Sequence, residues 1–185
     1  MTHLSPSFFF STPGYLLLAA LCASIGMVWD VRTRRIPNFL TVSFFLLGLL
    51  LHLATGGVKA ASLALAAGLI GGAIFLIFFI AGGMGAGDVK LMAAVCSIAA
   101  FGHLIEIFIA TALIGGLFAL GLAILRGRLK STLANVCKLV GHHAAMGWMP
   151  HPELNVNQPA TLRLPYGVAI AAGCWITFFA PRMLG

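Results

Sequence analysis

Long apolar runs make up most of the chain, and short clusters of polar and glycine residues separate them. A helix that crosses the hydrocarbon core of a bilayer needs about 20 predominantly apolar residues. The runs therefore predict six helices, with a turn at 55–57 and a glycine-rich break at 82–87. Their predicted ranges are 13–31, 37–54, 59–81, 88–101, 104–125 and 165–180. The fourth is the shortest, so we expect it to stop short of one membrane face or to start deeper than its neighbours.

The composition supports a membrane protein. Of the 185 residues, 61% are hydrophobic and 8% are charged, and the mean hydropathy is +1.05. Soluble domains carry about 25% charged residues, so this chain has too little polar material to cover a water-facing surface. The prediction is one all-α, polytopic membrane domain over residues 1–185 with about six transmembrane helices. A soluble enzyme, a disordered tail and a nucleic-acid-binding protein are excluded, despite the net charge of +7.

The basic residues predict the orientation of the chain in the membrane. Loops on the cytosolic side of a membrane are enriched in Lys and Arg. With the N-terminus outside, Lys59 and Arg182 fall outside, and the other nine of the 11 basic residues fall inside. These nine are Arg32, Arg34, Arg35, Lys90, Arg126, Arg128, Lys130, Lys138 and Arg163. Both termini are then expected outside, and the basic loop 126–163 in the cytosol, near anionic lipid.

The two aspartates are the main chemical signal. Asp30 closes the first predicted helix and Asp88 opens the fourth, so the two helices between them return the chain to the same membrane face. Two close carboxyl groups share a proton, because both cannot ionise cheaply. The ionised carboxylate can then take a proton from water while the protonated one polarises a peptide carbonyl. The alternative is two separate ion pairs, Asp30 with Arg34 or Arg35 and Asp88 with Lys90.

Two glycines stand directly before the second aspartate. Gly85 and Gly87 flank Ala86, and Asp88 follows. Glycine permits close approach of another backbone, which we expect of an extended peptide substrate, and a helix N-terminus favours an ionised Asp88. The other interpretation is a glycine-rich turn in which Asp88 is the N-cap.

Three segments together resemble the type IV prepilin peptidase family, which comprises GxGD aspartyl proteases of bacterial and archaeal plasma membranes. The segments are 30–38 (DVRTRRIPN), 85–91 (GAGDVKL) and 164–170 (LPYGVAI). The resemblance implies a GxGD-protease-like arrangement of helices, with Asp30 and Asp88 as catalytic aspartates and Gly85 and Gly87 as motif glycines. It also implies prepilin-type precursors as partners besides membrane lipids. The active site is expected to face the cytosol from the bacterial inner membrane.

Larger members of that family carry paired CxxC zinc ligands and methylate the new N-terminus. This chain has four widely spaced cysteines, with no CxxC pair, and its six histidines show no HxxxH or HExxH spacing. The resemblance is therefore closest to the short, peptidase-only members of Tad/Flp pilus systems. Neither a metal site nor a cofactor is expected.

Five further residues are candidates for shaping the site or binding substrate. Pro37 and Asn38 suit a helix start and a turn, with an indirect role in orienting the first aspartate. Lys90 is expected to point away from the second aspartate, toward lipid headgroups or an acidic group of the substrate. Pro165 and Tyr166 either begin the last helix or line the cleft.

Other polar and small residues are assigned to structure. Glu106 is expected at the outer boundary, away from the chemistry. Glycines in the third and fifth predicted helices indicate close helix packing. They are Gly68, Gly71, Gly72, Gly115 and Gly116.

Two other functions stay open from the sequence. A small proton-coupled transporter would use the aspartates as a relay, but it predicts acids near the bilayer centre and internal repeats. A presenilin-type or signal-peptide-peptidase-type protease would cut within a helix. Those families carry Pro-Ala-Leu in the last helix, where this chain has Leu-Pro-Tyr-Gly at 164–167.

Overall fold

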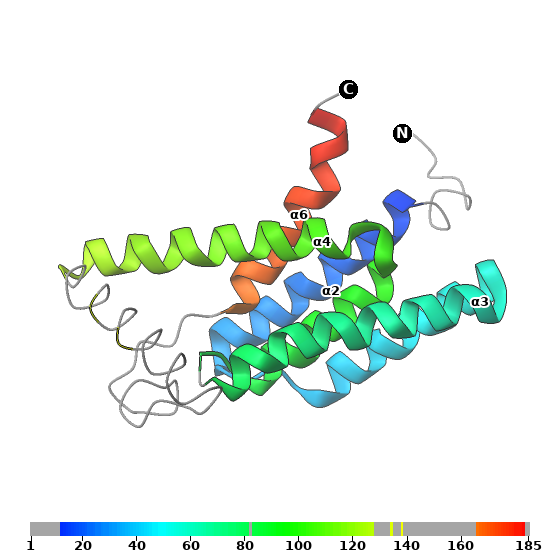
Figure 1. Ribbon diagram of the computed structural model, residues 1–185, viewed down its shortest axis with the longest axis horizontal. Coiled ribbons are helices and arrows are strands. Elements are labelled where there is room, and N and C mark those ends of the chain that lie inside the picture. Colours follow the sequence, from blue (N-terminus) through cyan, green and yellow to red (C-terminus); the bar gives the residue numbers. More distant parts are fainter. Residues whose placement is uncertain (1–11, 82, 128–133, 135–137, 139–165, 184–185) are drawn as a thin grey trace.

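The computed structural model describes residues 12–81, 83–127, 134, 138 and 166–183. Its helices are α2 (Thr12–Thr33), α3 (Asn38–Ile80), α4 (Ala86–Leu125) and α6 (Tyr166–Met183) (Figure 1). These ranges contain no strand, so the all-helical prediction is confirmed for this part of the chain. The predicted loop 126–163 lies almost wholly outside the described residues.

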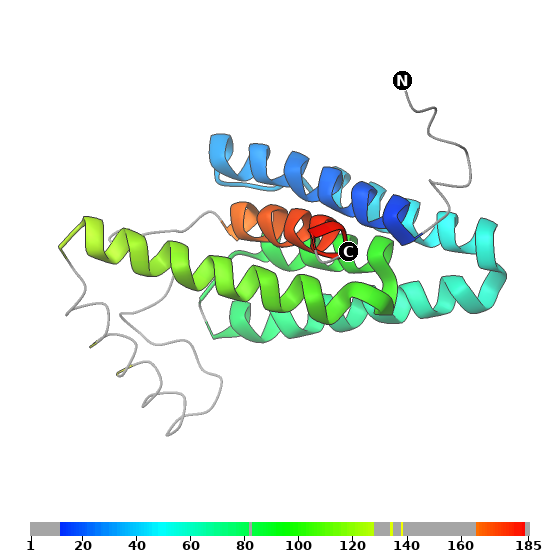
Figure 2. The same ribbon diagram turned by 90° about the horizontal axis from the view of Figure 1, so that it is seen from above.

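Both long helices reverse direction part-way along their length, as Figure 2 shows for α3 and α4. In α3 the reversal is at Gly57, whose φ of 68° and ψ of −164° suit glycine. The two halves of α3 lie side by side, since a Cβ built on Gly68 would be 2.6 Å from the ring of Phe45. In α4 the reversal is at Ala100, with φ 53° and ψ −165°. The predicted break after residue 101 therefore occurs slightly earlier.

Within the described residues, three helices are long and apolar enough to cross a membrane. They are Pro13–Thr33, Asn38–Ile80 and Ala86–Leu125, and a shorter apolar helix covers Tyr166–Ala180. Many large apolar side chains point outward, among them Leu117 and Leu125, which is typical of a surface that faces lipid. The reversals at Gly57 and Ala100 are compatible with six crossings, and that number stays a prediction.

The first half of α4 is the centre of the helix packing. α4 contacts α2, α3 and α6, and the side chains of Leu91, Met92, Val95 and Cys96 are fully buried. Small residues opposite them let the backbones approach closely. A Cβ on Gly71 would meet the sulfur of Cys96 at 2.5 Å.

The glycine prediction is confirmed for α3 and fails at one position in α4. A Cβ on Gly68 or Gly72 would meet α4 at 3.0 to 3.1 Å, through the Ala93 carbonyl oxygen or the Ala93 Cβ. Gly115 is in ordinary contact range of Ala169, at 3.6 Å. Gly116 has open space around it, so it makes no close contact with a neighbouring helix.

Polar contacts join the elements where the first half of α4 ends. The Nε2 atom of His52 lies 3.0 Å from the carbonyl oxygen of Ile98. The ring of Tyr15 stacks on His52 with centroids 4.4 Å apart, and the Tyr15 hydroxyl is 2.7 Å from Thr55 Oγ1. This group lies about 15 Å along α4 from Asp88, because an α-helix rises about 1.5 Å per residue.

Candidate active site

α2 ends one turn after Asp30. Arg34 follows with a left-handed φ of 55°, and its backbone N–H donates to the Asp30 carbonyl oxygen at 2.8 Å. A residue in this conformation is a common way to close a helix. The chain then turns at once, and four residues connect α2 to α3. That short connection brings Ile36 against the start of α4.

Asp88 lies in the first turn of α4. Gly85 is the N-cap, and its backbone N–H donates to Asp88 Oδ2 at 3.1 Å. The helix therefore begins at Ala86 rather than at residue 88, and Asp88 is its third residue rather than its N-cap. This corrects the N-cap interpretation of the sequence. The other carboxyl oxygen of Asp88, Oδ1, is buried and has no hydrogen-bond partner in the described part of the chain.

The start of α6 forms a third side of the site. The backbone N–H of Gly167 donates to Asp30 Oδ2 at 3.2 Å. The neighbouring Tyr166 is close enough to interact electrostatically with Asp88. Pro165, the other candidate in this segment, lies outside the described residues.

The structure brings Asp30 and Asp88 together. Their side chains are 9% and 7% exposed, and the two carboxyl groups interact electrostatically. Arg34 also acts on the charge of Asp30, as the ion-pair alternative expects. Lys90 instead donates from Nζ to Asn38 Oδ1 at 2.9 Å. This bond is one between helices α4 and α3, and it gives Lys90 a partner other than Asp88, lipid or substrate.

The motif glycines are close to atoms of this chain. A Cβ on Gly87 would lie 3.2 Å from the Cβ of Ile36, and one on Gly85 would lie 3.3 Å from Asp88 Oδ2. We expected these glycines to leave space for the backbone of a substrate. In the structure Ile36 and the Asp88 carboxyl lie where side chains at these positions would be, and contact with a substrate stays a prediction. Gly85 and Gly87 thus shape the site from within.

An open groove of about 410 Å³ follows the connection between α2 and α3. At its α2 end the groove is lined by Trp29, the residue before Asp30 in the sequence, and neither aspartate is among the lining residues. The predicted site residues Pro37 and Asn38 are in its wall, and the Lys90 ammonium is bonded to one of them. The lining residues are Trp29, Thr33, Arg35, Ile36, Pro37 and Asn38.

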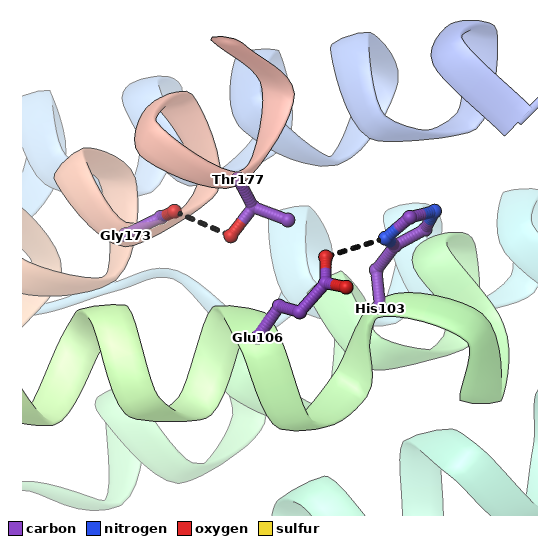
Figure 3. A network of polar contacts seen from close by, with 4 residues as sticks. All are labelled: His103, Glu106, Gly173 and Thr177. Atoms are coloured by element: carbon purple, nitrogen blue, oxygen red, sulfur yellow. Dashed lines mark hydrogen bonds and ion pairs between the residues drawn. The ribbon is translucent and has the colours of Figure 1, made fainter. Parts of the chain in front are cut away.

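Groups that could hold a metal ion, with three or more His, Cys, Asp or Glu side chains, do not occur in the described ranges. His103 and Glu106 pair with each other, with Nδ1 and Oε2 2.8 Å apart (Figure 3). The same view shows the Thr177 hydroxyl donating to the Gly173 carbonyl within α6. Glu106 lies in the second half of α4, beyond the reversal at Ala100, so it belongs to another part of the molecule than Asp88.

Two residues of the site are not identified from the sequence. Gly167 stands in the 164–170 segment, but nothing in that segment indicates a bond to a carboxylate 137 positions earlier. Ile36 carries no signal beyond its place next to Pro37. Both act through contacts between distant parts of the chain, and the spacing of residues in the sequence gives no information about such contacts.

The arrangement can perform general acid–base chemistry. Two buried carboxyl groups from different helices interact electrostatically, and a different backbone N–H donates to one oxygen of each. A pair of this kind can carry one proton between its members, so one carboxyl can accept a proton while the other donates.

Comparison with known protein families shows to which family the chain belongs. The sequence profile of the type IV leader peptidase family matches residues 16–120, which is more than half of the 185 residues and includes both aspartates. The chain belongs to the type IV leader peptidase family. The prepilin peptidase resemblance of its motifs is thereby confirmed. Searches of curated proteins and of solved structures found no match.

The residues that match the leader peptidase family include most of α2, all of α3 and most of α4. The matched range ends at residue 120, before α6 begins at Tyr166. The contact of Gly167 with Asp30 is therefore a finding of the structure that does not depend on the match. It adds to the candidate site a contact that lies beyond the matched residues.

Proposed function

We propose that this protein is an aspartic-type membrane endopeptidase that removes the leader peptide from prepilin-type precursors. The pairing of Asp30 with Asp88 carries the proposal. These two aspartates lie 58 positions apart on different helices, yet both are buried and they interact electrostatically. Burying two carboxyl groups in one place is costly unless they share a proton. That cost is the reason to assign them a chemical role.

In the proposed reaction, water is the nucleophile. The ionised carboxylate accepts a proton from water as the water oxygen bonds to the peptide carbonyl carbon, and the protonated carboxyl gives its proton to the carbonyl oxygen. The tetrahedral species then collapses, the C–N bond breaks, and the amine leaves with a proton. The products are a leader with a free carboxylate and a mature chain with a free amine. No metal ion and no covalent intermediate take part.

The proposed substrates are Flp-type prepilins, and the proposed product is not methylated. The support for this is the absence of any CxxC pair in the chain, since the family's methylating members carry such pairs. The apolar segment of the precursor would lie in the membrane, with its short leader in the cytosol. The scissile bond would then reach the depth of Asp30 and Asp88, at the helix ends where the groove beside Trp29 opens.

The charge distribution supports an inner-membrane location with the site facing the cytosol. Nine of 11 basic residues fall on one side of the predicted topology. That side is also where α2 ends and α4 begins, close to both aspartates.

The decisive experiment is processing of a Flp-type precursor by the purified full-length protein in detergent. Asp30→Asn and Asp88→Asn should each lower cleavage by at least about a thousandfold, because an amide cannot cycle a proton as a carboxyl does. Glu106→Gln is the matched control, since it removes an acid outside the site and should cleave at the normal rate.

Substantial processing by either aspartate variant would overturn the proposal. So would an equal loss in all three variants. Accumulation of each variant in the membrane, measured by immunoblot of membrane fractions, establishes that protein is present in comparable amounts.

A further inference from the structure

The start of α6 has a geometry that the reaction proposed above does not use. The first four N–H groups of a helix have no partner within that helix. In α6 one of these groups, the N–H of Gly167, donates to Asp30 Oδ2 at 3.2 Å. The N-terminus of a helix also favours negative charge. The bond therefore combines a direct contact with a favourable field at the same carboxylate.

A larger residue fits at this position only if its neighbours shift. A Cβ on Gly167 would lie 3.1 Å from both the Cβ and the Oδ2 of Asp30, and 3.2 Å from the Cα of Met27. The Cα of Met27 belongs to the α2 backbone, so it cannot turn away. The absence of a side chain at residue 167 thus lets the start of α6 touch α2 where Asp30 stands.

The two aspartates are held in different ways. Asp88 accepts its bond from Gly85, three residues earlier in the same helix. Asp30 accepts its bond from a residue 137 positions later. α4 can therefore orient Asp88 by itself, whereas the orientation of Asp30 depends on α6 being packed against α2 and α4, which it contacts.

We propose that the first turn of α6 is the positioning element for Asp30, and that the Gly167 N–H fixes one oxygen of this carboxylate while the other takes part in the reaction. Gly167 is thus a positioning residue, and the 164–170 segment has a defined task in turnover. This inference rests on the proposed aspartyl peptidase function.

The first test is Gly167→Ala in the full-length protein, assayed on a Flp-type precursor. We expect kcat to fall by about tenfold to a hundredfold, because a displaced Asp30 loses a hydrogen bond to a charged group. KM should stay within about twofold, since the substitution acts on Asp30 and not on the groove. Gly116→Ala is the matched control, because a Cβ there meets open space, and it should leave both constants unchanged.

The second test removes the N–H without adding bulk, and it decides the matter if Gly167→Ala fails to fold. Glycolic acid is incorporated in place of Gly167 during cell-free synthesis, so that an ester replaces the amide. The control incorporates 2-hydroxyisovaleric acid in place of Val168, in the same helical turn. We expect the ester at 167 to lower kcat about tenfold or more at unchanged KM, and the ester at 168 to be near the unmodified rate.

An unmodified kcat with the ester at 167 would overturn the positioning role, and so would an equal fall with the ester at 168. The outcome is separable from that of the proposed function. If Asp30→Asn and Asp88→Asn are inactive while the ester at 167 turns over normally, only the role of α6 is refuted. If both aspartate variants remain active, the peptidase proposal itself fails.

Discussion

Gly26 sets how closely the two helices that carry the aspartates approach each other. It lies one turn before Asp30 in α2, and Leu91 lies about one turn after Asp88 in α4. A Cβ on Gly26 would be 2.7 and 2.8 Å from the two δ carbons of Leu91 and 3.3 Å from its Cγ. Leu91 is fully buried, so a shift of its side chain has to displace other residues of the core. Gly26→Ala should therefore push α2 and α4 apart near the active site.

The size of the effect follows from opposing contributions. Overpacking a core by one methyl group costs about 1–3 kcal/mol, and alanine in place of glycine inside a helix recovers about 1 kcal/mol. Gly26→Ala should thus lower the free energy of unfolding by about 0–2 kcal/mol. Leu91→Ala alone should cost about 2–5 kcal/mol, because it leaves a cavity. In the double variant the new methyl group occupies part of that cavity, so its cost should be below the sum of the single costs by about 1 kcal/mol.

The assay is denaturant unfolding in detergent for the four proteins of this cycle, alongside precursor cleavage. Gly26→Ala should also lower kcat by about tenfold, because a misplacement of 1 Å at a reacting group can cost about a hundredfold. Additive costs, within about 0.5 kcal/mol, would show that the two residues do not share a contact. Normal cleavage by Gly26→Ala would show that the spacing of these helices does not control the aspartates.

Other outcomes test the surroundings of the site. Asn38→Ala removes the acceptor of the Lys90 ammonium and should lower the cleavage rate several-fold. Asn38→Asp keeps an acceptor for Lys90 and should lower the rate less. A smaller loss with alanine than with aspartate would contradict the role given to this bond. Treatment with EDTA should leave cleavage unchanged, because the proposed chemistry uses two carboxyl groups, and a loss that zinc restores would contradict it. A cysteine introduced at Thr33 should react with a membrane-impermeant reagent only from the cytosolic side, and one at Gly57 only from the outside; labelling of Thr33 from the outside would rule out cleavage of cytosolic leaders.

The juxtaposition of the aspartates could be predicted from the sequence because it depends on topology. Two long apolar runs between Asp30 and Asp88 return the chain to its starting face. The reversal within α3 was predictable for a similar reason. Gly57 stands in a polar cluster, and glycine accepts the positive φ that the turn requires.

The contacts that complete the site could not be predicted in this way. Gly87 indicates close approach of a backbone, but its spacing does not say whose, and the structure places Ile36 there. Ala100 gives no turn signal, since a positive φ is uncommon in alanine. From the sequence, Lys90 is predicted only as a charge near a membrane surface. Its bond to Asn38 depends on the fold, which brings α3 and α4 together at this point.

The bond from His52 to the Ile98 carbonyl has a consequence for how short a membrane helix can be. Carbonyl groups in the last turn of a helix have no partner within that helix, and hydrocarbon offers no water to replace it. With its Nε2–H tautomer, His52 supplies one such partner from the neighbouring helix at 3.0 Å. The first half of α4 can therefore end at the reversal without leaving that carbonyl unsatisfied. An imidazole on an adjacent helix thus donates the hydrogen bond that interfacial water donates to the last carbonyl groups of a full-length membrane helix.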